Sequence, residues 1–299
     1  MSIRNNAGNR AVKSPRSLNN IAVFKDTEKI CKSDSRIKED TKVSVQNQKV
    51  ILEDESLSQI ELNIYTRPSK IIVSKKRSFE AAKAYIGQKV AVHNFASATN
   101  PGGGVIIGSS AQEECLCRCS NLYFCLDTYG MWDRFYKPHR KANNPINNGD
   151  VIYTPDVCVF KTDTSNPELM EESEWYKVDV ITCAAPNLRK NPTNKFNAAN
   201  GDAPIKLDDE VLRSIHEKRL SRMLDIAVQN GVETIILGAF GCGAFKNNPD
   251  VVAEAAASVI PKYVYAFKNI EFAVYCPPKD DKNFDTFRKR FDKIENKLN

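Results

Sequence analysis

Three consecutive glycines, Gly102 to Gly104, stand between a strand pattern and a helix pattern. Residues 89–95 are mostly apolar, as in a buried strand, and residues 112–126 have the composition of a helix that opens with Gln, Glu and Glu. Glycine adopts backbone conformations that other residues avoid, so its N–H group can come close to an anion. The order of strand, loop and helix predicts a βα unit with a binding loop at the carboxyl end of its strand.

A second loop of the same kind follows later in the chain. Residues 234–237 predict a strand, residues 238–248 contain three glycines, and a helix is expected from Pro249, because proline is favoured in a first helical turn. We call residues 96–111 the first glycine loop and residues 238–248 the second glycine loop. Neither contains the dinucleotide fingerprint or the Walker sequence. Because helix N-termini favour phosphate, two such loops suggest a diphosphate ligand.

Strand and helix patterns alternate through most of the chain, which predicts an α/β fold with helices on both faces of a mixed, largely parallel central sheet. Further strands are expected at 71–73, 151–154, 157–160, 178–185 and 272–275. Further helices are expected at 19–32, at 56–60, at 78–85 with Ser78 as the cap, at 208–230, and on a C-terminal face with Phe284, Phe287, Phe291 and Ile294. The Asn- and Pro-rich segment 187–204 is expected to be a loop.

The composition limits where the protein works. Of the 299 residues, 41% are apolar, and no apolar run approaches the roughly 18 residues that a membrane span requires. The polar N-terminus lacks the apolar region of a signal peptide, so a cytoplasmic location and no membrane contact are expected. Nine cysteines, an odd number without the spacing of a small disulfide scaffold, indicate reduced thiols.

The net charge of +6 is carried by the N-terminal part of the chain. Residues 1–50 contain 11 Lys and Arg against 5 Asp and Glu, so the remainder is neutral. Because acids are interleaved with the bases, we interpret this part as a solvated appendage and expect no direct recognition of DNA or RNA. We divide the chain into a basic, partly helical N-terminal extension, residues 1–69, and a main domain, residues 70–299, and expect a monomer.

Glu113 and Glu114 are the candidate acids. At a helix start they could simply complement the helix dipole, but their place behind the triple glycine favours a chemical role. Adjacent helical residues point about 100° apart, so the two carboxylates are expected to have different tasks. One would protonate a leaving oxygen and the other would bind sugar hydroxyls. Since a helix N-terminus lowers a carboxyl pKa, we hypothesise that the pKa of the acid rises only when substrate is bound.

Other reactive side chains are given a structural interpretation. Cys115, Cys117 and Cys119 do not share one helix face, so no metal site and no cofactor are expected. Cys242 is interpreted as a small residue that fits a tight loop rather than as a reactive thiol. His93 is expected to be a hydrogen-bonded sheet residue, and His139 and His216 are expected at the surface. Phe245 could either stack on a ligand or belong to the core.

With these residues assembled, the chain resembles the bacterial-type poly(ADP-ribose) glycohydrolases, a catalytic branch of the macrodomain superfamily. The matching pattern is Asn-Phe-Ala-Ser-Ala-x-Asn-Pro-Gly-Gly-Gly from Asn94, followed after seven residues by Gln112-Glu113-Glu114. The similarity continues through residues 119–123, 151–157, 178–182 and 237–245, and covers roughly residues 70 to 280.

The resemblance implies a three-layer α/β/α macrodomain-like catalytic domain that binds ADP-ribose, with adenosine in a cleft and the diphosphate between the two glycine loops. By position in the motif, Glu114 would be the general acid and Glu113 would bind the distal ribose, with Phe245 beside it. The substrate-binding positions expected on this basis are Asn94, Asn100, Gly102, Gly103, Gly104, Val105, Gln112, Gly238, Gly241, Cys242, Gly243, Ala244 and Phe245. Differences from the family pattern at 105–107 and 109–110 leave the linkage preference open.

The function expected from this resemblance is hydrolysis of poly(ADP-ribose) to release ADP-ribose. Two alternatives remain open at this point. The chain could bind ADP-ribose without catalysis, as many macrodomains do, or it could hydrolyse mono-ADP-ribosylated protein or a related nucleotide. The presence of Glu113 and Glu114 favours an enzyme over a binding module.

Overall fold

The computed structural model describes residues 14–195 and 197–298, and the side chains only as far as residue 292. The start of the predicted N-terminal extension and the predicted contribution of Ile294 to a helix face therefore lie outside the described residues. The strands are β1 (Lys49–Ile51), β2 (Lys70–Ser74), β3 (Val90–Phe95), β4 (Val151–Val159), β5 (Tyr176–Cys183), β6 (Thr234–Leu237) and β7 (Asn269–Ala273). The helices are α1 (Pro15–Ser33), α2 (Ser35–Asn47), α3 (Ser78–Lys83), α4 (Gln112–Cys119), α5 (Leu122–Leu126), α6 (Tyr129–Met131), α7 (Lys137–Ala142), α8 (Asp209–Gln229), α9 (Pro249–Val259) and α10 (Lys282–Leu298). Short helical turns are η1 (Val105–Ile107), η2 (Trp132–Tyr136), η3 (Glu172–Glu174) and η4 (Ile260–Tyr263).

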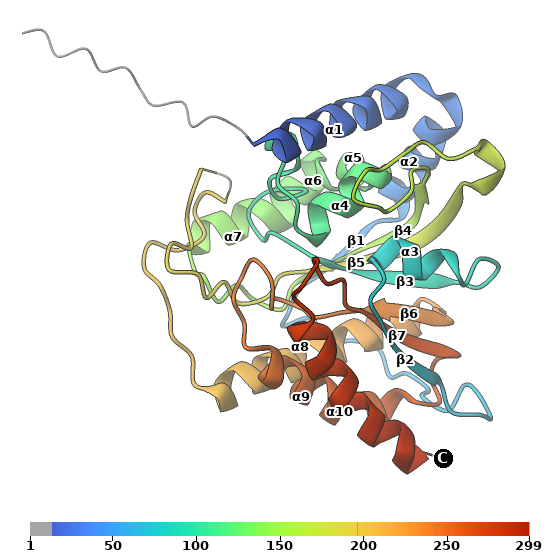
Figure 1. Ribbon diagram of the computed structural model, residues 1–299, viewed down its shortest axis with the longest axis vertical. Coiled ribbons are helices and arrows are strands. Elements are labelled where there is room, and N and C mark those ends of the chain that lie inside the picture. The colour runs from blue at the N-terminus through green and yellow to red at the C-terminus, as the bar shows by residue number, and fades with distance from the viewer. Residues whose placement is uncertain (1–13, 196, 299) are drawn as a thin grey trace, which may run out of the picture.

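The strands form one mixed sheet in the order β1-β4-β5-β3-β6-β7-β2. β5, β3, β6, β7 and β2 are parallel, and β4 and β1 add an antiparallel edge. Helices α1, α2 and α4 to α7 lie on one side of the sheet and α8 to α10 on the other (Figure 1). The predicted three-layer α/β fold with a mixed central sheet is confirmed. In the part of the chain that the structure describes, no helix is long and apolar enough to cross a membrane.

The central strands are buried on both faces, which explains why their sequences are continuously apolar rather than alternating. In β3, Ala91 packs into the core beneath α8 to α10, while Val92 packs into the core on the opposite face. In β6, Ile235 packs into the core beneath α8 to α10, and Ile236 packs into the core on the opposite face. The strands are therefore held firmly, and the loops at their ends can be positioned accurately.

The two short strands predicted at 151–154 and 157–160 are one strand, β4, with a register shift between Thr154 and Val157. Pro155 and Asp156 form this bulge, and Asp156 has a positive φ of 55°. Proline cannot donate a ladder hydrogen bond and is tolerated at a bulge, which interrupts the pairing without ending the strand. The Asp156 N–H donates to Asp179 of the neighbouring β5 at 3.1 Å.

The single helix predicted over 112–126 is wrong, because α4 and α5 are separated at Ser120 and Asn121. Ser120 has an extended backbone and forms a bridge with Val159 of β4. The Asn121 side chain accepts a hydrogen bond from Cys158 N–H at 2.9 Å. Contacts with a distant strand therefore end the first helix, a cause that local sequence does not contain.

Three further expectations were wrong. No helix occurs at 56–60 in the described chain, where Leu57 and Ile60 pack on the core from an irregular segment. Ser78 is the first residue of α3 rather than its cap, which is Arg77. The last strand lies at Asn269–Ala273, earlier than the 272–275 expected, because it pairs in register with β2 and β6.

The N-terminal segment packs closely on the rest of the chain. β1 pairs with β4 at the edge of the sheet, and α2 packs on β4. From α1, Ser17 Oγ donates to the Ile107 carbonyl and Asn20 Nδ2 to the Gly108 carbonyl, each at 3.0 Å. Helix α1 therefore contacts the first glycine loop directly. The division of the chain at residue 70 stays a prediction.

Candidate active site

A cavity of about 390 Å³ lies at the carboxyl ends of the parallel strands. Phe95 ends β3, Ala185 follows β5, Ala239 follows β6, and Val274 follows β7; all four line the cavity. This is where ligands bind in open parallel sheets, and the volume falls within the roughly 300–1,000 Å³ of small-molecule sites. Both glycine loops contribute to its walls, as the sequence predicted.

Glu113 is buried at the floor of this cavity. Its carboxylate accepts hydrogen bonds from the Ser97 N–H at 2.7 Å and from Asn94 Nδ2 at 3.4 Å. Burial raises the pKa of the Glu113 carboxyl well above its ordinary value, and the neighbouring Glu114 raises it further, against a lowering by those hydrogen bonds. Asn94 therefore contacts Glu113, and its direct contact with substrate stays a prediction.

Glu114 lies beside it with only one oxygen held by the protein. Its Oε1 accepts the Gly104 N–H at 2.8 Å, and its buried Oε2 has no hydrogen-bond partner among the described residues. Burial raises the pKa of the Glu114 carboxyl, while the Gly104 hydrogen bond and the Arg118 charge lower it. The hypothesis that the pKa rises only with substrate bound is therefore wrong, because burial under the first glycine loop already raises it in the chain alone.

The triple glycine is required by the acids as well as by any ligand. Gly102 and Gly103 have φ of 63° and 56°, which favour glycine. A Cβ on Gly103 would lie 2.5 Å from Glu114 Oε1 and 3.0 Å from Glu113 Oε2. A side chain at Gly103 would thus displace both carboxylates.

The second glycine loop is held by a buried, uncharged pair of side chains. Asn247 Nδ2 donates to the carbonyls of Pro186 at 2.7 Å, Gly241 at 3.2 Å and Phe245 at 3.3 Å. Because this nitrogen donates, Asn247 Oδ1 accepts, and His216 Nε2, at 2.8 Å, is its donor. Burial lowers the pKa of His216 to about 4, so this imidazole stays neutral near pH 7.

The expected substrate-binding positions divide into two groups. Those that line the cavity are Gly103, Gln112, Gly241, Gly243, Ala244 and Phe245, together with both acids. Those that lie outside the lining are Asn94, Asn100, Gly102, Gly104, Val105, Gly238 and Cys242. Asn100 contacts Arg140 and Asn197, and Val105 is fully buried. Direct substrate contact by any of these residues stays a prediction.

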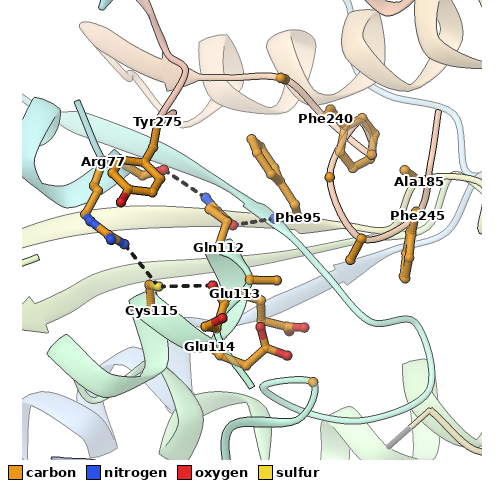
Figure 2. A pocket seen from close by; sticks show the side chains of 18 of the residues that line it. Arg77, Phe95, Gln112, Glu113, Glu114, Cys115, Ala185, Phe240, Phe245 and Tyr275 are labelled. Atoms are coloured by element: carbon orange, nitrogen blue, oxygen red, sulfur yellow. Dashed lines mark hydrogen bonds between the residues drawn. The ribbon is translucent and has the colours of Figure 1, made fainter. Parts of the chain in front are cut away.

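Gln112 is engaged with the protein on both ends of its amide. Its oxygen accepts the Phe95 N–H at 2.9 Å, and its nitrogen donates to the His93 carbonyl at 2.7 Å and to Ser78 Oγ at 3.0 Å. Figure 2 shows this side chain between β3 and α4, beside the acids. Gln112 therefore ties the helix that carries the acids to the central strand.

Sequence reasoning missed the residues at one end of the cavity. Arg77 lies with its guanidinium carbon 3.9 Å from the centre of the Tyr275 ring and donates to Cys115 Sγ at 3.4 Å (Figure 2). Asp163 also lines this part, and burial raises its pKa to about 6. Tyr275 follows β7, so the rule that ligands bind at carboxyl strand ends could have found it. Nothing in the local sequence indicates Arg77 or Asp163.

The surface positions expected for two histidines were wrong, and the expectation of reduced thiols is confirmed. His139 and His216 are buried rather than exposed, and His93 Nε2 has no hydrogen-bond partner in the described chain. All nine cysteines are free thiols. Burial raises the pKa of the Cys242 thiol, which is consistent with a packing role. Among the described residues, no group of His, Cys, Asp or Glu could hold a metal ion.

Comparison with known proteins agrees with this geometry. The family model of the microbial-type PARG catalytic domain matches residues 19–162. The chain is similar to the crystal structure of poly(ADP-ribose) glycohydrolase from Thermomonospora curvata, with 28% identity over 92% of this chain and 100% of that one, and a TM-score of 0.76. A structure of that enzyme bound to the inhibitor ADP-HPD gives a TM-score of 0.75 at the same identity and coverage.

The poly(ADP-ribose) glycohydrolase of Deinococcus radiodurans, in complex with ADP-ribose, is 26% identical over 85% of this chain and 97% of that one, with a TM-score of 0.70. No curated protein sequence matches the chain. The fold and site define a macrodomain-like glycosidase. The chain is similar to the microbial-type poly(ADP-ribose) glycohydrolases in sequence and fold, which confirms the resemblance and the enzyme class expected from the sequence.

Proposed function

We propose that this protein hydrolyses poly(ADP-ribose) and releases ADP-ribose, with Glu114 as the general acid. The observation that carries this assignment is the Glu114 carboxyl, which is buried, has a raised pKa, and has one oxygen held by Gly104 N–H and the other without a protein partner. A proton on Glu114 Oε2 would be available to a leaving oxygen. The solved relatives include a complex with ADP-ribose, which supports this class of ligand.

The cavity suggests one orientation for ADP-ribose. Glu113 and Glu114 lie between Tyr275 on one side and Phe245 on the other (Figure 2). The adenosine would lie against Tyr275 and Arg77, the diphosphate between the glycine loops, and the distal ribose over the acids and beside Phe245. An aromatic face suits a nucleobase, and backbone N–H groups of glycine loops suit phosphate.

The reaction follows from these positions. Glu114 would transfer its proton to the ribose oxygen of the departing unit as the glycosidic bond breaks. Glu113 would hold the distal ribose hydroxyls while positive charge develops at the anomeric carbon. Water would then add to that carbon and return a proton to the Glu114 carboxylate, which restores the acid.

The test uses labelled poly(ADP-ribose) and mono-ADP-ribosylated protein with the native chain and a Glu114→Ala variant. We expect release of ADP-ribose from the polymer and a loss of about 10²–10⁴-fold in kcat for the variant. Binding without release by the native chain would leave only an ADP-ribose-binding function. Release from the mono-modified protein alone would favour the other hydrolase, and an equally active variant would disprove the assignment of the acid.

A further inference from the structure

The loop after β5 connects the two glycine loops across one end of the cavity. We call residues 187–201 the strap, of which all but residue 196 are described. The Leu188 N–H donates to the Phe245 carbonyl, in the second glycine loop, at 2.9 Å. Asn197 accepts a hydrogen bond from Ser97 Oγ at 2.5 Å, and the Ser97 N–H in turn binds Glu113. The strap therefore passes the acids on the side of Phe245, away from Tyr275.

Arg189 of the strap is a half-buried cation that lines the cavity. Its Nε donates to Asn187 Oδ1 at 2.9 Å, and its Nη2 donates to the Pro192 carbonyl at 2.7 Å. Its guanidinium carbon lies 5.5 Å from the centre of the Phe245 ring. These three partners fix the orientation of the guanidinium before any ligand arrives, and none of them carries a charge that would compensate its own.

The strap is positive by composition. Residues 187–201 contain Arg189, Lys190 and Lys195 but no Asp or Glu. Of these three cations, Arg189 lines the same cavity as the two glutamates. Clustered cations next to a site attract polyanionic ligands and favour their phosphate groups.

A poly(ADP-ribose) substrate has phosphates in the unit that is cleaved off and in the leaving unit, and Arg189 lies on the side of the leaving unit. In the proposed orientation, the diphosphate of the cleaved ADP-ribose lies between the glycine loops, on the Tyr275 side of the distal ribose. Beyond that ribose, past the scissile bond, only a polymer offers phosphate, because its leaving group is another ADP-ribose unit. A mono-modified protein offers an amino-acid side chain there.

We infer that Arg189 and the strap bind the phosphates of the leaving ADP-ribose unit, and so select poly(ADP-ribose) over singly modified protein. The inference rests on the proposed function for its orientation of ADP-ribose. It makes Arg189 a specificity-determining residue that is separate from the acids.

Binding measurements in a Glu114→Ala background test the inference without hydrolysis of the ligand. Fluorescence anisotropy would give the Kd of a defined poly(ADP-ribose) oligomer and of free ADP-ribose. We expect Arg189→Ala to weaken oligomer binding by about tenfold and ADP-ribose binding by less than about twofold. Arg189→Lys keeps the positive charge but loses the planar guanidinium, which can donate two parallel hydrogen bonds to a phosphate. Its loss of affinity for the oligomer is expected to be smaller than that of Arg189→Ala.

Arg36 provides a matched control, since its guanidinium carbon also lies 5.5 Å from an aromatic ring, that of Trp175, outside the cavity lining. Arg36→Ala is expected to change neither Kd, and melting temperatures would confirm that each variant is folded. An equal loss for both ligands, or no loss for the oligomer, would overturn the inference. Equal competition by an RNA of the same length as the oligomer would also overturn the inference. Release of ADP-ribose by the native chain is measured separately and tests the proposed function alone.

Discussion

The two glycine loops follow the same order of strand, loop and helix, yet they are held by different chemistry. The first is tied to charged groups, because Gly104 donates to Glu114 and Ser97 donates to Glu113. The second is tied to the neutral Asn247 and His216. Protonation therefore bears directly on the first loop, while the second keeps its shape across the same pH range. This difference suits one loop to acid catalysis and the other to ligand binding.

The largest effect on catalysis is expected from Gly103→Ala in the first glycine loop. The new methyl group would meet Glu114 Oε1 at 2.5 Å and would also strain a backbone with φ of 56°. Because a misplacement of about 1 Å can cost about 10²-fold in rate, we expect kcat on poly(ADP-ribose) to fall by about that factor. Gly231→Ala is the matched control.

Gly231 also has a positive φ, of 70°, but nothing lies within 4 Å of the Cβ position. Gly231→Ala is expected to lower the melting temperature through backbone strain and to leave kcat unchanged. Full kcat in Gly103→Ala would show that the acids do not depend on the space above Gly103.

The second loop is tested by Asn247→Ala, which removes a side-chain donor to two carbonyls of the loop and to the Pro186 carbonyl after β5. The Gly241 and Phe245 carbonyls keep backbone N–H partners, so the Pro186 carbonyl is the one left without its donor. An unpaired buried carbonyl costs roughly 1–3 kcal/mol, and some of that cost would appear as a displaced loop. We expect the Kd for ADP-ribose to rise by about tenfold, with a smaller change in kcat. Since His216 has a pKa of about 4, the effect should be constant between pH 6 and 8.

Asn269→Ala serves as the control for Asn247→Ala. Asn269 also donates from a side-chain amide, to Thr234 Oγ1 at 2.9 Å, but it lies at the amino end of β7, away from the cavity. Its substitution should leave the Kd unchanged. A loss of kcat with an unchanged Kd in Asn247→Ala would contradict the assignment of the second loop to binding.

The smallest effect expected is on stability. Burial raises the pKa of Glu113 in the folded chain, so its contribution to stability is present below the ordinary carboxyl pKa and is lost as pH rises through the folded value. Glu113→Gln removes this titration. We expect the melting temperature of the variant, relative to that of the native chain, to be about 2 °C higher at pH 8 than at pH 5.

In the second loop, Cys242→Ser should leave the slope of melting temperature against pH unchanged, because burial keeps that thiol protonated over this range. Parallel curves for the native chain and Glu113→Gln would mean that Glu113 titrates alike in the folded and unfolded chain. Thermal melts at several pH values are sufficient for both variants.

Much of the site could be predicted from local sequence. The triple glycine, the Gln-Glu-Glu run and the loop before Pro249 all lie at strand ends, and the cavity is at those ends. What local sequence could not supply were contacts between distant segments. Asn121 binds β4 and ends α4, and Arg189 reaches Phe245 from the loop after β5. Such contacts depend on packing that no single stretch encodes.

The sequence by itself indicated the resemblance to the poly(ADP-ribose) glycohydrolases, the order of strands and loops, and the candidate acid pair, because these depend on glycine geometry and on short patterns. The tertiary structure decided the state of those residues. It buries Glu113 and Glu114 beneath Gly103, which raises their pKa values, and it buries His216 behind the second loop as a neutral partner of Asn247. The hydrogen bonds involved join residues 10 to 31 positions apart in the sequence, and the low polarity of their buried surroundings gives the two loops their different chemistry.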